Sequence, residues 1–215
     1  MVKHSLWSDD YWLLLMQLYL KRPMGVKPLY SKALVSLALE LHIPPQFLYE
    51  QMFKLRSIDT PRMERLWKTY GENKQKLRRG VRLLRQRMGY GSANMFYDGV
   101  EINESFEKDF KPLEEDGRFT PLMLVVILDL YFRLTPLTMV EDTPEIMQLA
   151  RLMKIKPKMV VEVMNVFQCC DPYLKRSGGE QHALMGPCKQ IWNRFGNDNP
   201  QKLAALAAQM KEYFK

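Results

Sequence analysis

Residues 31–57 and 143–169 decide the fold because they repeat one pattern: they read SKALVSLALELHIPPQFLYEQMFKLRS and TPEIMQLARLMKIKPKMVVEVMNVFQC. The second stretch follows the first at a constant offset of 112 residues, and at this offset the match extends without a gap over residues 7–59 and 119–171. Identical residues are few, but the apolar residues and the expected helix-starting residues fall at the same positions in the two stretches. A repeat of this length predicts a duplicated domain and not a short solenoid unit.

Each repeated stretch has the pattern of two helices joined by a tight turn. In the first stretch Leu48, Met52 and Leu55 recur at the i, i+4, i+7 spacing of one buried helical face. Pro45 and Pro157 stand where the second helix of each pair begins, a position that proline favours. Four hydroxyl residues precede the apolar-periodic runs and are the predicted helix N-caps: Ser8, Ser31, Thr120 and Thr143.

Further helices are expected on both sides of each pair. The first covers about residues 9–21, and its counterpart begins after Thr120. A fourth helix contains Trp67 in the first copy and Trp192 in the second, and these equivalent places favour core packing over ligand binding. A last helix, rich in alanine and leucine, begins at Asn199-Pro200.

The predicted fold class is therefore all-α, with two tandem helix-turn-helix-like domains from an internal duplication. Residues 1–90 form the first domain, which ends in a basic helix, and residues 118–215 form the second. Residues 91–117 are predicted to connect the two. Within this segment, residues 95–102 are either a short hairpin around Asp98-Gly99, because that dipeptide favours tight turns, or irregular.

The repeated helices have the spacing of a helix-turn-helix. A small residue on the first helix, Ala38 or Ala150, permits a close crossing, and ten residues later Leu48 or Val160 fills the angle between the two helices. In DNA-binding proteins with this motif the second helix enters the major groove. Many helical bundles contain the same corner and touch no nucleic acid, so the motif predicts geometry more strongly than it predicts a ligand.

The net charge of +8 is concentrated in the first half of the chain. Residues 1–112 contain 19 Lys and Arg against 12 Asp and Glu, whereas residues 113–215 contain 13 against 12. No acidic residue lies between Glu72 and Asp98, and seven basic residues fall there: Lys74, Lys76, Arg78, Arg79, Arg82, Arg85 and Arg87. Such a cluster attracts polyanions, although a solvated helix face has the same composition.

Two sets of side chains are predicted to contact nucleic acid. The seven basic residues between 74 and 87 are candidates for phosphate contact, because charge neutralisation supplies much of the affinity for nucleic acid. Polar and lysine side chains in or beside the second helix of each pair are candidates for base or phosphate contact: Gln46, Lys54, Lys154, Lys156, Lys158 and Asn165. Glu50 and Glu162 on the same helices repel phosphate, so phosphate contact by residues 74–87 is favoured over base reading.

Five segments of the second copy form a pattern that covers roughly residues 119–195. They read FTPLMLVVILDLYFRL from residue 119, TPEIMQLARL from 143, KMVVEVMNVF from 158, DP from 171 and QIWNRF from 190. This pattern resembles a helical domain found at the N-terminus of bacterial HNH-type restriction endonucleases. The resemblance implies a role in engaging DNA. It implies no catalysis, because the nuclease part of that family holds a metal through paired histidines and an asparagine, and no such motif surrounds the three histidines of this chain: His4, His42 and His182.

The sequence therefore predicts a non-enzymatic protein that binds nucleic acid, with DNA as the expected partner. The alternative is a protein-interaction or scaffold module that retains the fold without binding DNA, and the nearly neutral second copy favours it. No cofactor, metal or small-molecule substrate is expected, since no glycine-rich phosphate loop or metal-ligand spacing occurs. Three cysteines, an odd number, and the absence of an apolar run as long as a membrane span predict a cytoplasmic protein without a membrane partner.

Overall fold

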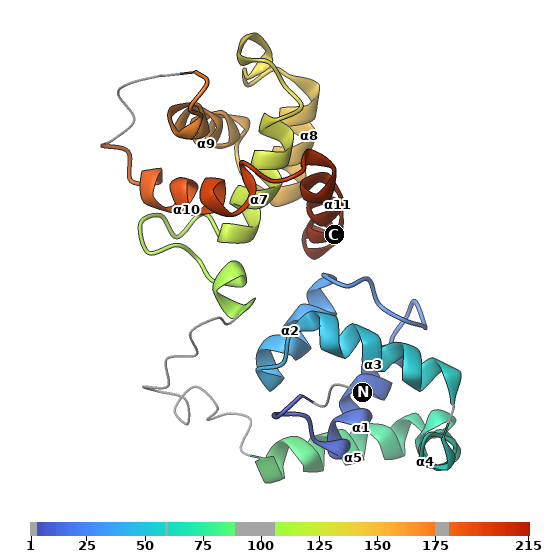
Figure 1. Cartoon of the computed structure of the whole chain (residues 1–215). Coiled ribbons are helices and arrows are strands. Elements are labelled where there is room, and N and C mark those ends of the chain that lie inside the picture. The colour runs from blue at the N-terminus through green and yellow to red at the C-terminus, as the bar shows by residue number, and fades with distance from the viewer. Residues whose placement is uncertain (1–3, 59, 89–105, 175–180) are drawn as a thin grey trace. The chain divides into compact units, whose positions relative to one another are not determined.

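The chain folds into two compact units, Met1–Ser105 and Phe106–Lys215, called unit 1 and unit 2 below (Figure 1). The computed structural model describes residues 4–58, 60–88, 106–174 and 181–215. Within these residues every regular element is a helix, so the all-α fold class is confirmed. Residues 95–102, for which a hairpin or an irregular chain is predicted, lie outside the described residues.

Unit 1 is organised around its first long helix, α1. Its elements are the 3-10 turn η1 (Asp9–Tyr11), α1 (Trp12–Leu20), α2 (Lys32–Leu41), α3 (Pro45–Ser57), α4 (Pro61–Leu66), the π-helical turn η2 (Trp67–Gly71) and α5 (Lys74–Met88). Helices α2, α3 and α5 all pack on α1, which lies between α3 and α5 in Figure 1. Leu15 and Met16 of α1 and Met52 of α3 are fully buried, because they fill the space between these helices.

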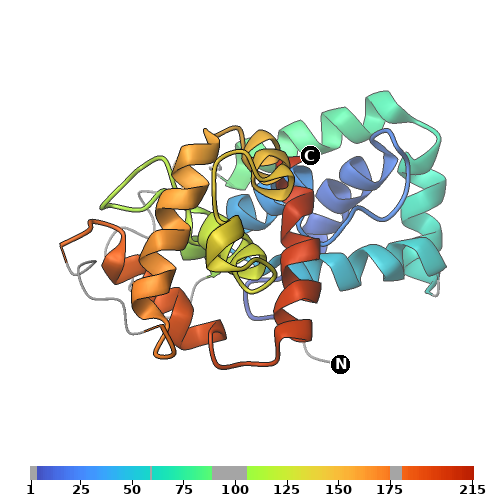
Figure 2. The same ribbon diagram turned by 90° about the horizontal axis from the view of Figure 1, so that it is seen from above.

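Unit 2 is organised in the same way around α7. Its elements are η3 (Phe106–Phe110), α7 (Pro121–Tyr131), η4 (Pro136–Thr138), α8 (Pro144–Met153), α9 (Pro157–Cys170), α10 (Met185–Phe195), α11 (Pro200–Met210) and η5 (Lys211–Phe214). Helix α7 is buried from Leu122 to Tyr131, since α8, α9, α10 and α11 all pack on it. Helices α9 and α11 lie on opposite sides of α7 (Figure 2).

The two helix pairs that the repeat predicts have matching geometry. Helices α2 and α8 begin and end at an offset of 112 residues, and α3 and α9 begin at the same offset. The turn residues His42 and Lys154 both adopt the left-handed conformation, with φ of 54° and 59°. The next residue closes each turn in the same way: the amides of Ile43 and Ile155 donate over 3.0 Å to the carbonyls of Ala38 and Ala150. The common origin of the two units stays a prediction, but their local geometry agrees with it.

The predicted N-caps divide into two groups. The side chains of Ser8 and Thr120 accept hydrogen bonds from the amides of Asp10 and Met123, at 3.4 and 3.3 Å. Ser31 and Thr143 occupy the N-cap positions of α2 and α8, but neither side chain forms a capping hydrogen bond. The expectation of side-chain capping is wrong at these two residues. The Thr143 hydroxyl donates backward to the Thr138 carbonyl instead, and the buried Ser31 hydroxyl has no hydrogen-bond partner among the described residues.

Each unit contains a tyrosine, a tryptophan and a glycine in the same arrangement. Tyr19 packs edge-on against Trp67 with ring centroids 5.7 Å apart, and Tyr131 packs on Trp192 at 5.9 Å. The indole ring lies over the glycine four residues further on, so that a Cβ atom at Gly71 or Gly196 would approach the ring to 2.7 Å. This close approach requires glycine at both positions. It agrees with the predicted packing role of the two tryptophans.

The last long helix of each unit packs its apolar side on the first. Leu77, Val81 and Leu84 of α5 are buried, as are three residues of α11 at an offset of 126: Leu203, Ala207 and Met210. The two helices also begin at this offset, at Lys74 and Pro200. Their remaining positions can therefore be compared one by one, and Arg85 at the end of α5 corresponds to Lys211 at the end of α11.

Part of the predicted connecting segment is a structured element of unit 2. The 3-10 turn η3, Phe106–Phe110, packs on α7. Phe110 is buried and its ring lies 5.3 Å from that of Tyr213, while Asp109 pairs with Arg194 of α10 at 3.1 Å. Residues 106–110 therefore contribute to the packing of unit 2, although they fall within the 91–117 segment that lacks a helical pattern.

Candidate nucleic-acid interface

The seven basic residues of α5 lie on different sides of the helix. At about 100° per residue, the buried stripe of Leu77, Val81 and Leu84 defines the side that faces α1. Lys74, Arg78, Arg82 and Arg85 fall along one flank of that stripe. Lys76 and Arg87 fall along the other flank, and Arg79 points away from α1. The predicted cluster is thus divided between two flanks and an outer face.

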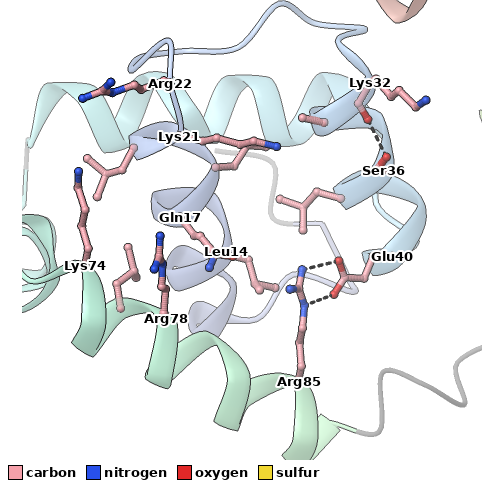
Figure 3. Close-up of a pocket in the computed structure, with 15 residues that line it drawn as sticks. Leu14, Gln17, Lys21, Arg22, Lys32, Ser36, Glu40, Lys74, Arg78 and Arg85 are labelled. Atoms are coloured by element: carbon pink, nitrogen blue, oxygen red, sulfur yellow. Dashed lines mark hydrogen bonds and ion pairs between the residues drawn. The ribbon is translucent and has the colours of Figure 1, made fainter.

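A groove in unit 1 runs between α1, α2 and α5 and has a volume of about 820 Å³. We call it the cationic groove, because it is lined by six basic residues, Lys21, Arg22, Lys32, Lys74, Arg78 and Arg85, and by one acidic residue, Glu40. Leucines of all three helices form its apolar part. Figure 3 shows Lys74, Arg78 and Arg85 projecting from the same side of α5 towards α1 and α2.

Glu40 neutralises one cation of the groove. Its two carboxylate oxygens accept hydrogen bonds from Nε and Nη2 of Arg85 at 2.6 and 2.8 Å, a bidentate ion pair that ties the end of α5 to α2 (Figure 3). Glu40 is the only acidic residue in the groove lining, all of which belongs to the described part of unit 1. Five cations of the lining therefore have no carboxylate beside them within the groove. On the other flank of α5, Arg87 pairs with Asp10 at 2.6 Å.

The loop between α1 and α2 brings Lys21 and Arg22 to the groove. Lys27 holds this loop in place: its side chain is buried, and its ammonium group donates to the carbonyl oxygens of Lys21, at 2.7 Å, and of Pro23. Burial lowers the pKa of Lys27, and the charge of Lys21 lowers it further. Gly25, with φ of 131°, closes the loop through a 2.9 Å hydrogen bond from its amide to the Tyr19 carbonyl.

The structure does not bring Gln46 and Lys54 of α3 into the cationic groove. Both form hydrogen bonds within unit 1: Gln46 Nε2 donates to the Tyr30 hydroxyl at 2.6 Å, and Lys54 Nζ donates to Gln51 Oε1 at 3.0 Å. Helix α3 and helix α5 both pack on α1, and no residue of α3 lines the groove. The polar residues of α3 and the basic flank of α5 therefore belong to separate surfaces of unit 1.

In unit 2 the predicted residues surround the start of α9. Lys154, Lys156 and Lys158 are exposed in the turn before the helix and in its first turn, and Asn165 is exposed further along it. Free amides at a helix N-terminus favour anions, and the three lysines add positive charge there. Glu162 on the same helix lies 3.1 Å from the Nε2 atom of His182.

Three basic residues of the groove lining and the amide of Gln17 are absent from the site predicted from the sequence: Gln17, Lys21, Arg22 and Lys32. They are distant in sequence from the cluster at 74–87, and only the packing of α5 on α1 brings them beside it. The basic pair Lys21-Arg22, at the end of the first predicted helix, is the one sequence signal that could have pointed to these residues. Conversely, four of the seven predicted basic residues of α5 do not line the groove: Lys76, Arg79, Arg82 and Arg87.

The three cysteines are free thiols. The Sγ atom of Cys170 lies 3.8 Å from the Sδ atom of Met185, and burial raises the pKa of both Cys170 and Cys188. These two thiols are therefore protonated at neutral pH. Among the described residues, no group of three or more His, Cys, Asp or Glu side chains is placed to hold a metal ion. The helices of the described segments include none with the length and apolar composition of a membrane span.

The chain was also compared with known proteins. No protein-family model, no curated protein and no solved structure matches it.

Proposed function

We propose that this protein binds nucleic acid, with DNA as the ligand, and that it does so without catalysing a reaction. The observation that carries the proposal is the cationic groove, where six basic side chains from α2, α5 and the loop after α1 meet a single carboxylate that Arg85 already occupies. Groups of lysine and arginine with few acidic neighbours bind phosphates by releasing the counterions that surround nucleic acid.

The basic side chains extend beyond the groove along α5. This helix has 15 residues and is about 22 Å long. Arg79 and Arg82 are exposed on it outside the groove. A ligand with phosphates at regular intervals can contact both the groove and this exposed face, whereas a small anion reaches only the groove. The extended distribution of charge therefore favours a polyanion as the ligand.

Unit 2 supplies a second, weaker contact in this proposal. Lys154, Lys156 and Lys158 lie at the N-terminus of α9, where free amides also favour an anion. Two linked contacts bind one ligand more tightly than either contact alone, because the first raises the effective concentration of the second. We therefore expect duplex binding to depend mainly on unit 1 and to be strengthened by unit 2.

A second candidate is a protein-interaction module, and one observation favours it. Unit 2 exposes large apolar side chains: the exposed fractions of Leu137, Val140 and Met147 are 90%, 51% and 42%. Exposed apolar side chains mark protein-binding surfaces where they gather into a patch. In this reading the basic face of α5 is a solvated helix surface.

Fluorescence anisotropy with a labelled random-sequence duplex, over a series of salt concentrations, tests the proposal. The groove variant Lys74→Ala/Arg78→Ala removes two cations from the groove. The control variant Lys76→Ala/Arg87→Ala removes two cations from the other flank of the same helix, so both variants have the same net charge. We expect the groove variant to bind more weakly than the control and to reduce the slope of log K against log salt by about two.

The outcomes separate the two candidate functions. Wild-type binding in the micromolar range that weakens with salt supports nucleic-acid binding. Equal losses in both variants place the ligand on α5 as a whole and not in the groove. The absence of any binding at 50 mM salt contradicts the nucleic-acid proposal and leaves the protein-interaction module as the better candidate.

A further inference from the structure

A buried carboxylate in unit 2 neutralises two cations. The side chain of Asp129, on α7, is 6% exposed, and its Oδ2 atom lies 2.8 Å from Nη2 of Arg133 and 3.5 Å from Nζ of Lys211. Arg133 follows one turn later in the chain, and Lys211 lies at the end of α11. The carboxylate thus joins the first and the last helix of unit 2 through an internal counter-ion.

The corresponding position in unit 1 has no carboxylate. At the offset of 112 residues, Asp129 corresponds to Gln17 and Arg133 to Lys21, and the packing of the last helices makes Lys211 correspond to Arg85. All three of these unit 1 residues line the cationic groove. Arg85 is paired with Glu40 on α2. The position of the Asp129 carboxylate in unit 2 is taken by the neutral amide of Gln17 in unit 1.

Unit 1 also has a cation in the groove that has no counterpart in unit 2. Arg78 lines the groove on α5, and its counterpart on α11 is Ala204, by the offset of 126 that relates the two helices. Gln17, Lys21 and Arg78 therefore offer an amide donor, an ammonium group and a guanidinium group within the groove lining. We propose that this part of the groove holds one phosphate group, which takes the place of the internal carboxylate of unit 2.

The chemistry of the three side chains fits a phosphate group. Its oxygens accept several hydrogen bonds at once, and its negative charge is matched by Lys21 and Arg78. The amide of Gln17 donates to an oxygen without adding charge, whereas a carboxylate at this position repels phosphate. The inference rests on the proposed function if the phosphate belongs to a nucleic-acid backbone. It stands alone if the phosphate is free.

The variant Gln17→Glu tests the inference because it restores a carboxylate at the position of Asp129. Gln86→Glu is the matched control: it makes the same change of charge on the exposed side of α5, outside the groove. The probe is inorganic phosphate, added against sodium chloride of equal ionic strength, and the readout is the rise in Tm. Binding of the duplex is then measured for the same two variants.

We expect phosphate to raise the Tm of the wild type and of Gln86→Glu, since a ligand that binds only the folded state stabilises it. We expect Gln17→Glu to bind phosphate at least about tenfold more weakly, and to have the higher Tm without phosphate, because its carboxylate pairs internally with Lys21 and Arg78. Equal phosphate responses of the two variants overturn the inference. So does the lack of a phosphate-specific rise in the wild type.

The duplex measurement identifies the source of the phosphate and separates the two proposals. If Gln17→Glu weakens duplex binding more than Gln86→Glu does, the bound group is a backbone phosphate. If the variants bind the duplex equally but differ towards inorganic phosphate, the group is free phosphate. A wild type that binds phosphate and no duplex supports the phosphate site and contradicts the proposed function.

Discussion

Helices α5 and α11 occupy corresponding positions in their units and share a pattern of buried residues, but they differ in their exposed side chains. Each packs on the first helix of its unit through apolar residues at the same spacing, Leu77, Val81 and Leu84 in one and Leu203, Ala207 and Met210 in the other. The exposed positions differ: Arg78, Arg79 and Arg82 correspond to Ala204, Ala205 and Ala208, and all six residues are exposed. The packing positions thus set the fold, while the exposed positions are free to set the charge of each unit.

The polar residues at the corresponding positions 17 and 129 also differ in charge. Unit 2 places Asp129 between Arg133 and Lys211 and so neutralises its own cations. Unit 1 has Gln17 at the corresponding position. The groove that contains Lys21 and Arg78 has one carboxylate in its lining, that of Glu40, and this carboxylate pairs with Arg85. A shared helical frame therefore holds an internal ion pair in one unit and an open cationic groove in the other. Four predictions test this comparison.

The largest effect is expected in the two cores. Met52 of α3 and Met164 of α9 occupy corresponding positions and are fully buried. Met52→Ala and Met164→Ala should each destabilise their own unit by about 2–5 kcal/mol, because each removes buried apolar atoms and leaves a cavity. Hydrogen exchange monitored by mass spectrometry measures the loss of protection in each unit. A variant that lowers the protection of both units equally contradicts their separate cores.

Removing the internal counter-ion of unit 2 should have the next largest effect. Asp129→Asn leaves Arg133 and Lys211 without their carboxylate and should lower the free energy of unfolding by about 1–3 kcal/mol. Urea denaturation of the full chain measures this change. Asp142→Asn, which removes the charge of an exposed aspartate in the same unit, is the control. If the two variants are equally stable, Asp129 does not have the structural role that distinguishes unit 2 from unit 1.

Arginines placed on α11 should give unit 2 the affinity for duplex DNA that is proposed for α5. The triple variant Ala204→Arg/Ala205→Arg/Ala208→Arg changes three exposed positions, and alanine and arginine have similar helix propensities. We expect tighter duplex binding, with a salt dependence that steepens by about one for each arginine that contacts a phosphate. Circular dichroism checks that the fold is kept. Unchanged binding by the folded variant indicates that the groove geometry of unit 1, and not exposed charge alone, holds the ligand.

The smallest effect is expected at low pH in unit 2. A hydrogen bond from the Arg118 guanidinium lowers the pKa of Asp116 from its ordinary value of 3.8. The stabilisation from this pair is present above that value and is lost as the pH falls through the lower pKa of the folded state. Arg118→Gln should therefore reduce stability slightly at pH 6 and not at all near pH 2, and the effect is small because the pair lies at the surface. Denaturant unfolding at both pH values checks this, and an equal difference at the two values contradicts the pairing.

Much of the fold could be predicted from local sequence. The offset of 112 residues and the apolar periodicity predict the starts of α2, α3, α8 and α9 correctly, because helix period and proline placement are local properties. Side-chain capping by Ser31 and Thr143 was predicted wrongly, since the path of the preceding chain decides where each hydroxyl points. The turn at Phe106–Phe110 was missed because its buried face is recognisable only once α7 lies against it.

The candidate site could be predicted only in part. A run of basic residues without acids is visible in the sequence at 74–87, but the buried stripe of α5 decides which of them line the groove. Lys21, Arg22 and Lys32 join Lys74 and Arg78 because α5 packs on α1. The pairing of Arg85 with Glu40 also depends on this packing.

The sequence by itself determined the helices, the repeat and the excess of positive charge in the first half of the chain, because periodicity, offset and composition are properties of the chain alone. Only the tertiary structure decided which cations share a groove, which are paired with carboxylates, and that Gln17 lines the groove whereas Asp129 pairs with two cations. The physical reason is that charges interact through space, so the effect of a lysine or arginine is fixed by the side chains that packing places around it.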